Sequence, residues 1–132
     1  MMNLPLAHVN SYLLLDGNKY EIVEFNVVFI QPTDHKGQPQ HEMNGGRINI
    51  TIPHIGDNTL YEWSKSSTTL KNGEIIFETE MSSHVMRVGF YNAYCIQLEH
   101  QIKESEGTSI RVVISPEILT INDIEHNNFW EK

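Results

Sequence analysis

Seven histidines are the residues of this 132-residue chain that could most readily bind a metal ion. Metal-binding histidines and cysteines usually recur at short spacings, such as His-x-His, His-Glu-x-x-His or paired Cys and His. None of these spacings occurs among His8, His35, His41, His54, His84, His100 and His126. We therefore predict no metal ion and no cofactor, and a metal-dependent enzyme built on these histidines is kept as a minor alternative.

The residues that could act as nucleophile, acid or base give no stronger signal. Cys95 is the single cysteine, and it alternates with Tyr94 and Ile96 in a predicted strand that offers no activating base. Five scattered carboxylates could be paired in space, but carboxylates on strands are normally solvated; they are Glu42, Glu62, Glu78, Glu80 and Glu99. We predict a structural thiol at Cys95 and no catalytic residues.

The glycine pair Gly45-Gly46 does not indicate a phosphate-binding loop. Dinucleotide and P-loop glycines precede a helix, whereas this pair precedes the alternating segment "RINITIP" at residues 47–53. Glycine at the exit of a loop more often supplies a positive φ angle. The alternation predicts a strand whose isoleucines 48, 50 and 52 face a core.

The size and charge of the chain limit its class. A chain of 132 residues is one ordinary domain, so we predict a single domain over residues 1–132, with 1–10 as an extra N-terminal segment. The net charge is −8 and the basic residues are scattered, which disfavours nucleic acid. The lone cysteine, the lack of a signal-peptide pattern at the start and the lack of an apolar membrane-length run predict a protein of the reducing cytoplasm that is not inserted in a membrane.

Period-two alternation recurs along most of the chain. Residues 11–29 predict a short strand, an Asp16-Gly17 hairpin turn, and a long strand with a bulge or bend where the apolar set shifts at Val23. Further strands are predicted at 73–79, 85–90, 93–102 and 108–121, with turns at Asn92 and at 104–107. Their core-facing parity would include Met86, Val88, Phe90, Tyr94, Ile96, Leu98, Ile110, Val112 and Ile114.

Two segments interrupt the strands. Residues 31–46 carry two prolines and no apolar periodicity, and they are too long for a simple hairpin connection, so they predict a functional loop. Residues 56–67 predict a short helix, capped by Asp57 or Asn58, with Leu60 and Trp63 facing inward. The whole pattern predicts a mainly antiparallel β-barrel or two-sheet sandwich that carries one helix.

Several segments, taken in order, resemble the Hcp tube proteins of type VI secretion, in particular the divergent branch called TssD. The resemblance covers roughly residues 11–130. It rests on a D-x-x-G-x-P loop, the glycine pair, the helix with Trp63, the segment 90–94 and the ending 126–130, within "DHKGQPQHEMNGGRINITI", "DNTLYEW", "MRVGFYNAYCI" and "EHNNFW".

The resemblance implies an antiparallel β-barrel of two curved sheets with one flanking helix, assembled into hexameric rings that stack into a hollow tube. It implies no enzyme activity, partners in a contractile sheath, a spike protein and effectors, and secretion through the type VI apparatus without a signal peptide. On this basis the loop residues expected at subunit or ring contacts are Asp34, Gly37, Pro39, Gly45 and Gly46.

The same reading assigns roles to seven further residues. The polar side of the strand at 47–53 is expected to face the tube lumen or a neighbouring subunit, through Arg47, Asn49 and Thr51. Four aromatic residues are expected to be structural, namely Trp63, Phe90, Tyr94 and Trp130. The main rival is a monomeric β-barrel that binds a small ligand in its interior, which apolar inward-facing positions would also permit.

Overall fold

The computed structural model describes residues 9–30, 44–53, 57–79, 82–105 and 107–130. In these residues the chain forms eight strands and one helix. The first four strands are β1 (Asn10–Leu15), β2 (Asn18–Ile22), β3 (Glu24–Ile30) and β4 (Asn44–Ile52). Helix α1 (Thr59–Lys65) follows, and the remaining strands are β5 (Lys71–Thr79), β6 (Ser82–Lys103), β7 (Gly107–Ile121) and β8 (Ile124–Asn127).

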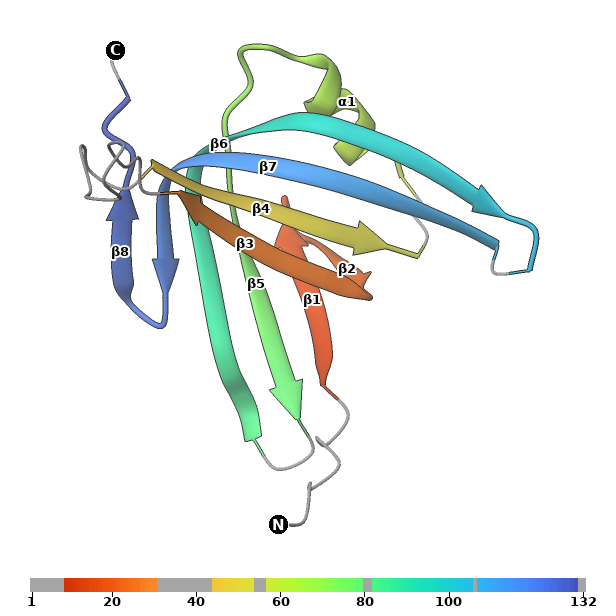
Figure 1. Cartoon of the computed structure of the whole chain (residues 1–132), viewed down its shortest axis with the longest axis horizontal. Helices are drawn as coiled ribbons and strands as arrows, with labels where there is room; N and C mark the ends of the chain where they lie inside the picture. The colour runs from red at the N-terminus through yellow and green to blue at the C-terminus, as the bar shows by residue number, and fades with distance from the viewer. Residues whose placement is uncertain (1–8, 31–43, 54–56, 80–81, 106, 131–132) are drawn as a thin grey trace, which may run out of the picture.

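The strands form one antiparallel sheet that curls into a barrel. Its order is β2-β1-β5-β6-β7-β4-β3, and β8 adds to β7 outside this path. Strands β1, β5 and the first part of β6 run across the direction of β3, β4 and the second part of β6, so the sheet has two layers (Figure 1). At Val23 strand β2 leads directly into β3, and the Val23 N–H donates to the Thr51 carbonyl of β4 at 2.9 Å. The two ends of the strand order therefore meet through the chain itself.

Apolar side chains from both layers fill the interior. Ile48, Ile50 and Ile52 are at most 1% exposed, which confirms that the isoleucine side of β4 faces the core. They pack with buried residues of the other strands, among them Leu13, Ile75, Val88, Phe90, Val112 and Leu119. Burial on this scale is the main stabilisation of a domain of this size, at about 25 cal/mol per Å² of apolar surface.

The first hairpin follows the sequence prediction. Asp16 and Gly17 have φ angles of 51° and 79°, and two positive φ angles in a two-residue turn match the right-handed twist of a β-hairpin. The predicted change of face near Val23 is also confirmed, because the chain bends there between β2 and β3. Val23 itself is 56% exposed, so it belongs to neither buried row.

Strand β6 differs from the sequence prediction in two ways. Asn92 does not end a strand: it has a φ of 52° within the continuous strand β6. The predicted core positions of Tyr94 and Ile96 are wrong: Tyr94 is partly exposed and Ile96 is 48% exposed, while Ala93 and Cys95 are buried. The left-handed residue at Asn92 moves the buried parity by one residue, and a bulge between Cys95 and Gln97 moves it back.

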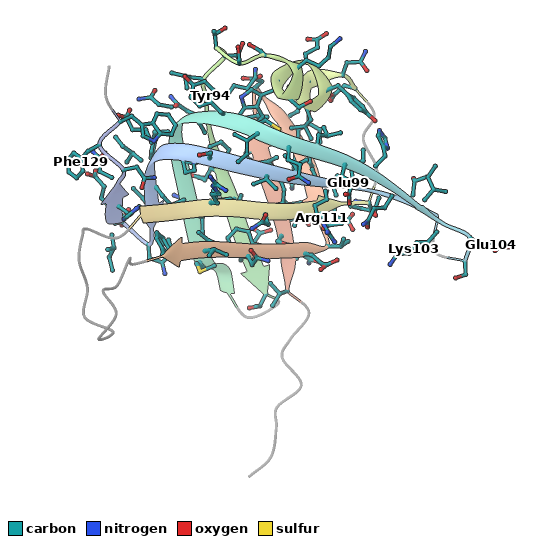
Figure 2. All side chains as sticks on the ribbon, turned by 45° about the horizontal axis from the view of Figure 1, so that its top comes forward. Tyr94, Glu99, Lys103, Glu104, Arg111 and Phe129 are labelled. Carbon is teal, nitrogen blue, oxygen red and sulfur yellow. The ribbon has the colours of Figure 1, made fainter. Side chains whose placement is uncertain are left out.

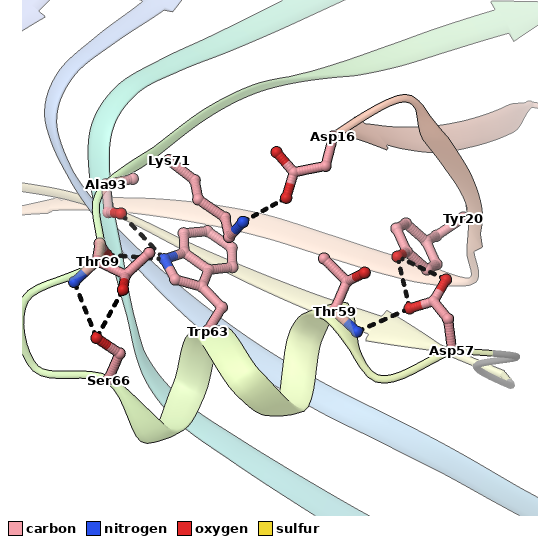
Figure 3. Close-up of polar contacts among 9 residues, drawn as sticks. All are labelled: Asp16, Tyr20, Asp57, Thr59, Trp63, Ser66, Thr69, Lys71 and Ala93. Atoms are coloured by element: carbon pink, nitrogen blue, oxygen red, sulfur yellow. Dashed lines mark hydrogen bonds and ion pairs between the residues drawn. The ribbon is translucent and has the colours of Figure 1, made fainter.

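Helix α1 begins and ends close to the predicted bounds. The backbone N–H of Thr59 donates to Asp57 Oδ1 at 2.9 Å, so Asp57 rather than Asn58 supplies the side-chain cap. Figure 3 shows the second tie, in which Tyr20 of β2 donates its hydroxyl hydrogen to the Asp57 carboxylate, at 3.0 Å from each oxygen. This network fixes the start of α1 to the barrel.

The C-terminal segment adds an element that the sequence reasoning did not predict. Strand β8 pairs with the end of β7 after a turn in which Asn122 and Asp123 both have positive φ angles. The Asn128 N–H then donates to the Glu117 carbonyl at 2.8 Å, which continues the attachment beyond β8. Across the part of the chain that the structure describes, no helix has the length and apolar character needed to cross a membrane.

Candidate functional site

Mostly polar side chains line the outer face of strands β3, β4, β7 and β6. Residues that lie opposite one another across the four strands form rows on this face. One row is Glu24, Thr51, Arg111 and Glu99, and the next is Asn26, Asn49, Val113 and Gln97. We call these eight residues the polar face. Alternation places them opposite the buried isoleucines, so the sheet separates an apolar interior from a polar exterior.

The residues predicted to face a lumen or a neighbour all lie on this side of β4. Arg47 is exposed, and Asn49 donates an amide hydrogen to Asn26 Oδ1 at 2.8 Å. Thr51 points the same way but is only 7% exposed, because it lies between Glu24 and Arg111 of the adjacent strands. Arg47 and Asn49 therefore offer contact surface, while Thr51 contributes little.

A shallow hollow of about 310 Å³ opens on the polar face. Its lining combines amides, a hydroxyl and charges of both signs, from Glu24, Phe25, Asn26, Asn49, Thr51 and Arg111. Among the described residues Arg111 forms no ion pair, although its row contains Glu24 and Glu99. Sequence reasoning did not single out Arg111; the available signal was its position between Ile110 and Val112 in an alternating strand.

The sheet that bears the polar face has an unpaired edge at each side. In the described part of the chain β3 pairs only with β4, and β6 beyond Ala93 pairs only with β7. A second hollow, of about 400 Å³, separates the end of α1 from the β6 edge at Tyr94, Cys95 and Ile96. Unpaired edges present backbone N–H and C=O groups that can pair with another chain.

Of the predicted loop contacts, Asp34, Gly37 and Pro39 lie outside the described residues. Gly45 pairs with Phe29 at the start of β4. Gly46 has a φ of 71°, and a Cβ atom there would lie 3.2 Å from Phe29 and 3.4 Å from His126. Only glycine combines this φ with this close approach, so the exit of the predicted loop is packed tightly against β3 and β8.

The four aromatic residues lie in two stacks. Trp63 and Phe90 are at most 1% exposed, with ring centroids 6.3 Å apart and an interplanar angle of 14°. The Trp63 indole N–H is 3.2 Å from both the Thr69 and the Ala93 carbonyls (Figure 3). Tyr94 stacks on Trp130 with centroids 5.4 Å apart, and both side chains are partly exposed.

The described side chains give little indication of a catalytic site. Burial raises the pKa of the Cys95 thiol to about 11, which opposes formation of a nucleophilic thiolate. Among the described residues no three His, Cys, Asp or Glu side chains gather as metal ligands. Glu42 and Glu80 lie outside the described residues. The buried carboxylate that sequence reasoning missed is Glu117, which accepts a hydrogen bond from the Asn92 amide at 3.1 Å and so ties the bends of β6 and β7 together.

Several solved structures share this fold. Hcp1 from Flavobacterium johnsoniae has 23% identity and a TM-score of 0.82, covering 90% of this chain and 99% of its own. A double mutant of Hcp1 from E. coli EAEC 042 has 18% identity and a TM-score of 0.73, covering 92% and 98%. The tube-terminating cap of the anti-feeding prophage has 16% identity and a TM-score of 0.61, covering 92% and 93%. At these identities the likeness shows the fold.

The sequence match is more specific than the structural likeness. No curated protein matches the chain by sequence. Residues 7–131, however, match the family described as hemolysin coregulated protein Hcp (TssD). Since this match spans nearly the whole chain, the protein belongs to the Hcp (TssD) family, the tube proteins of type VI secretion systems.

Proposed function

We propose that this chain is a non-catalytic subunit that forms hexameric rings, which stack into the inner tube of a type VI secretion system. The observation that carries the proposal is the pair of unpaired edges, β3 and the end of β6, on one sheet with a polar outer face. A closed ring needs two different, complementary surfaces on each subunit. We assign the two edges to these two surfaces.

The two edges can join in a continuous antiparallel sheet. Successive strands in the order β6-β7-β4-β3 are antiparallel, so β3 runs opposite to β6. Rotation about a ring axis preserves the axial direction of each strand, so β3 of one copy would run antiparallel to β6 of the next. Strand β3 has 7 residues, and the β6 edge is open from Tyr94 to Lys103, so β3 fits within its length. Backbone pairing across this contact would satisfy the edge groups.

This arrangement explains why the outer face of the sheet is polar. Six joined sheets would turn their polar faces toward the same side, and we assign that side to the lumen. A water-filled lumen suits the Asn26–Asn49 amide pair and the charges of Arg47 and Arg111, which would be costly to bury. Effectors carried there would meet a hydrated wall with charges of both signs.

The long loop supplies the second contact of the proposal. We assign the residues from Pro32 to Gly46, including Asp34, Gly37 and Pro39, to a contact with an adjacent subunit or ring. The packed glycine at position 46 supports this, because it fixes the direction in which the chain leaves the barrel. Strand β4 begins at Asn44, so the exchange must stop before it. Replacing residues 33–43 by a few flexible residues should spare the barrel, since loop-closure entropy varies slowly with length. Electron microscopy should then show single rings and no stacks; intact stacking would remove the loop from the proposal.

The proposed order of folding, assembly and export rests on membership of the Hcp (TssD) family. The subunit would fold in the cytoplasm, polymerise inside a contractile sheath, and leave the cell with the spike protein and effectors, without a signal peptide.

The rival reading, a monomeric barrel with a ligand in its interior, receives no support from the described core. Phe90, Ile48 and Val112 have no exposed surface, and both hollows named above lie on the outside of the barrel.

The proposal is tested by the mass of the protein in solution. We expect the purified chain to form a closed ring in light scattering and in negative-stain images, with each contact burying on the order of 1,600 Å². Ile96→Lys places a charge beside the α1 hollow at the β6 edge and should yield a folded monomer. The matched control, Ile124→Lys, changes an isoleucine that is 76% exposed on β8 and should keep the ring. A parent protein that stays monomeric at high micromolar concentration would overturn the proposal.

A further inference from the structure

The tip of the β6–β7 hairpin extends beyond the rest of the sheet as a two-stranded ribbon. Ile110 is the β7 residue nearest the hairpin tip that pairs with β4, where its partner is Ile52. Within the described residues, the hairpin beyond this pair has no third strand. We call residues 101–105 and 107–109 the arm. Figure 2 shows the arm projecting past the barrel, with Lys103 and Glu104 near its tip.

As far as the described residues show, the side chains of the arm are mostly uncovered. Its described side chains from residue 102 to residue 108 are all exposed, and only Gln101 and Ser109 at its base are partly covered. A two-stranded hairpin with no covering layer is marginally stable in water. The ladder nevertheless continues to the pair Lys103 and Gly107. An extended ribbon of this kind gains stability when a partner packs on it.

The arm carries one large apolar side chain, and most of its surface is exposed. Ile102 is 79% exposed, more than any other large hydrophobic side chain that the structure describes. Alternation along β6 places it on the same side of the sheet as His100, and His100 stacks on Tyr61 of α1 with centroids 5.2 Å apart. Ile102 thus lies on the inner side of the sheet, at a position beyond the rest of its own barrel.

We infer that Ile102 packs against the start of β3 in the adjacent subunit of the same ring. This inference rests on the proposed function, because it takes the joined β6 and β3 edges as given. The arm is the direct continuation of the β6 edge, so a copy paired along that edge is the partner that its apolar side meets. The antiparallel arrangement brings the beginning of β3, rather than its end, toward the arm.

The start of β3 offers a matching apolar surface. Val23 is 56% exposed, and Phe25 is partly exposed on the inner side of the sheet, where its ring meets Phe77 edge-on with centroids 5.0 Å apart. An isoleucine placed there would cover the apolar rim of the neighbouring barrel. Covering the exposed part of Ile102 against this surface would remove apolar area of both subunits from water, which favours the contact.

The first test measures ring stability on dilution. Ile102→Ser should raise the concentration at which rings dissociate by about tenfold or more, because the contact loses most of its buried apolar surface. Ile102→Leu should restore the parent behaviour, and Ile124→Ser on β8 should leave it unchanged. All four proteins should have the same melting temperature when measured as dissociated subunits. Rings of Ile102→Ser that resist dilution like the parent would overturn the inference while leaving the proposed function in place.

The second test locates the partner residue. In the double variant with Ile102→Cys and Val23→Cys, mild oxidation should form disulfides between neighbouring subunits. A disulfide requires Cβ atoms about 3.5–4.5 Å apart, so its formation reports that the two positions are in contact. Cys95 can stay, since it is buried. Denaturing gels should show a ladder ending at the hexamer, while either single variant should give no ladder. Cross-links that run beyond the hexamer would place the arm between stacked rings and overturn the inference; a parent that forms no ring at all would instead refute the proposed function.

Discussion

Gly73 on β5 gives the sharpest test of how the core is packed. A Cβ atom at this position would lie 2.3 Å from Cζ and 2.9 Å from Cε1 of Phe90, and 3.0 Å from the Leu14 carbonyl oxygen. Carbon atoms prefer separations of about 3.5–4.0 Å, so Gly73→Ala requires the Phe90 ring to move by more than about 1 Å. The ring is fully buried and stacked on Trp63, and Leu14 belongs to a paired strand, so neither neighbour can yield easily.

The expected cost follows from these contacts. Overpacking of a core costs roughly 1–3 kcal/mol, and a contact this short should fall at the upper end of that range. Alanine also restricts the unfolded chain more than glycine does, which offsets about 0.4–1 kcal/mol of this loss of stability. The net loss should be about 2 kcal/mol, which for a domain of this size lowers the melting temperature by roughly 6–10 °C. Calorimetry at one fixed protein concentration measures this, because assembly also changes the apparent stability.

A double-mutant cycle separates this cause from others. Phe90→Leu shortens the side chain that blocks the new methyl group, so the cost of Gly73→Ala in that background should fall by about 1 kcal/mol or more. The control is Gly17→Ala, which has no atom within 4 Å of the added Cβ but a φ of 79°. Its cost, of about 1–2 kcal/mol, should be the same with either residue at position 90. Strictly additive costs for Gly73→Ala and Phe90→Leu would refute the packing argument.

Three other side chains give independent predictions. Trp63→Ala should cost roughly 3–5 kcal/mol in denaturant unfolding, because the indole is buried and donates to the barrel; parent-like unfolding would mean that α1 does not cover the core. Burial opposes the charged form of Asp57, but hydrogen bonds from Thr59 and Tyr20 hold its pKa below the ordinary value. The stability that Asp57 contributes should therefore be lost as the pH falls below about 4. Asp57→Ala should remove that acid sensitivity. Burial raises the pKa of Cys95 to about 11 from about 8.5 unfolded, so stability should fall as the pH rises through that interval, and a Cys95→Ala variant with the same alkaline loss would contradict this.

The sequence by itself determined the elements whose signal is local. Alternation of isoleucine with polar residues in β4 predicted its buried side, and Asp16-Gly17 predicted the first hairpin, since both depend on a few neighbouring residues. The spacing of Leu60 and Trp63 likewise predicted the inner side of α1. The order of weak motifs along the chain predicted the family, which the match over residues 7–131 confirmed.

Only the tertiary structure decided where the alternation changes and which edges stay open. The buried parity of β6 moves at Asn92 because its amide reaches Glu117 on β7, a contact between residues that are far apart in the sequence. The low exposure of Thr51 depends in the same way on Glu24 and Arg111 of two other strands. The open edges of β3 and β6 and the arm with Ile102 follow from strand order and strand length. These features arise from long-range pairing, which period-two patterns do not encode because every strand shows the same alternation whichever neighbour it has.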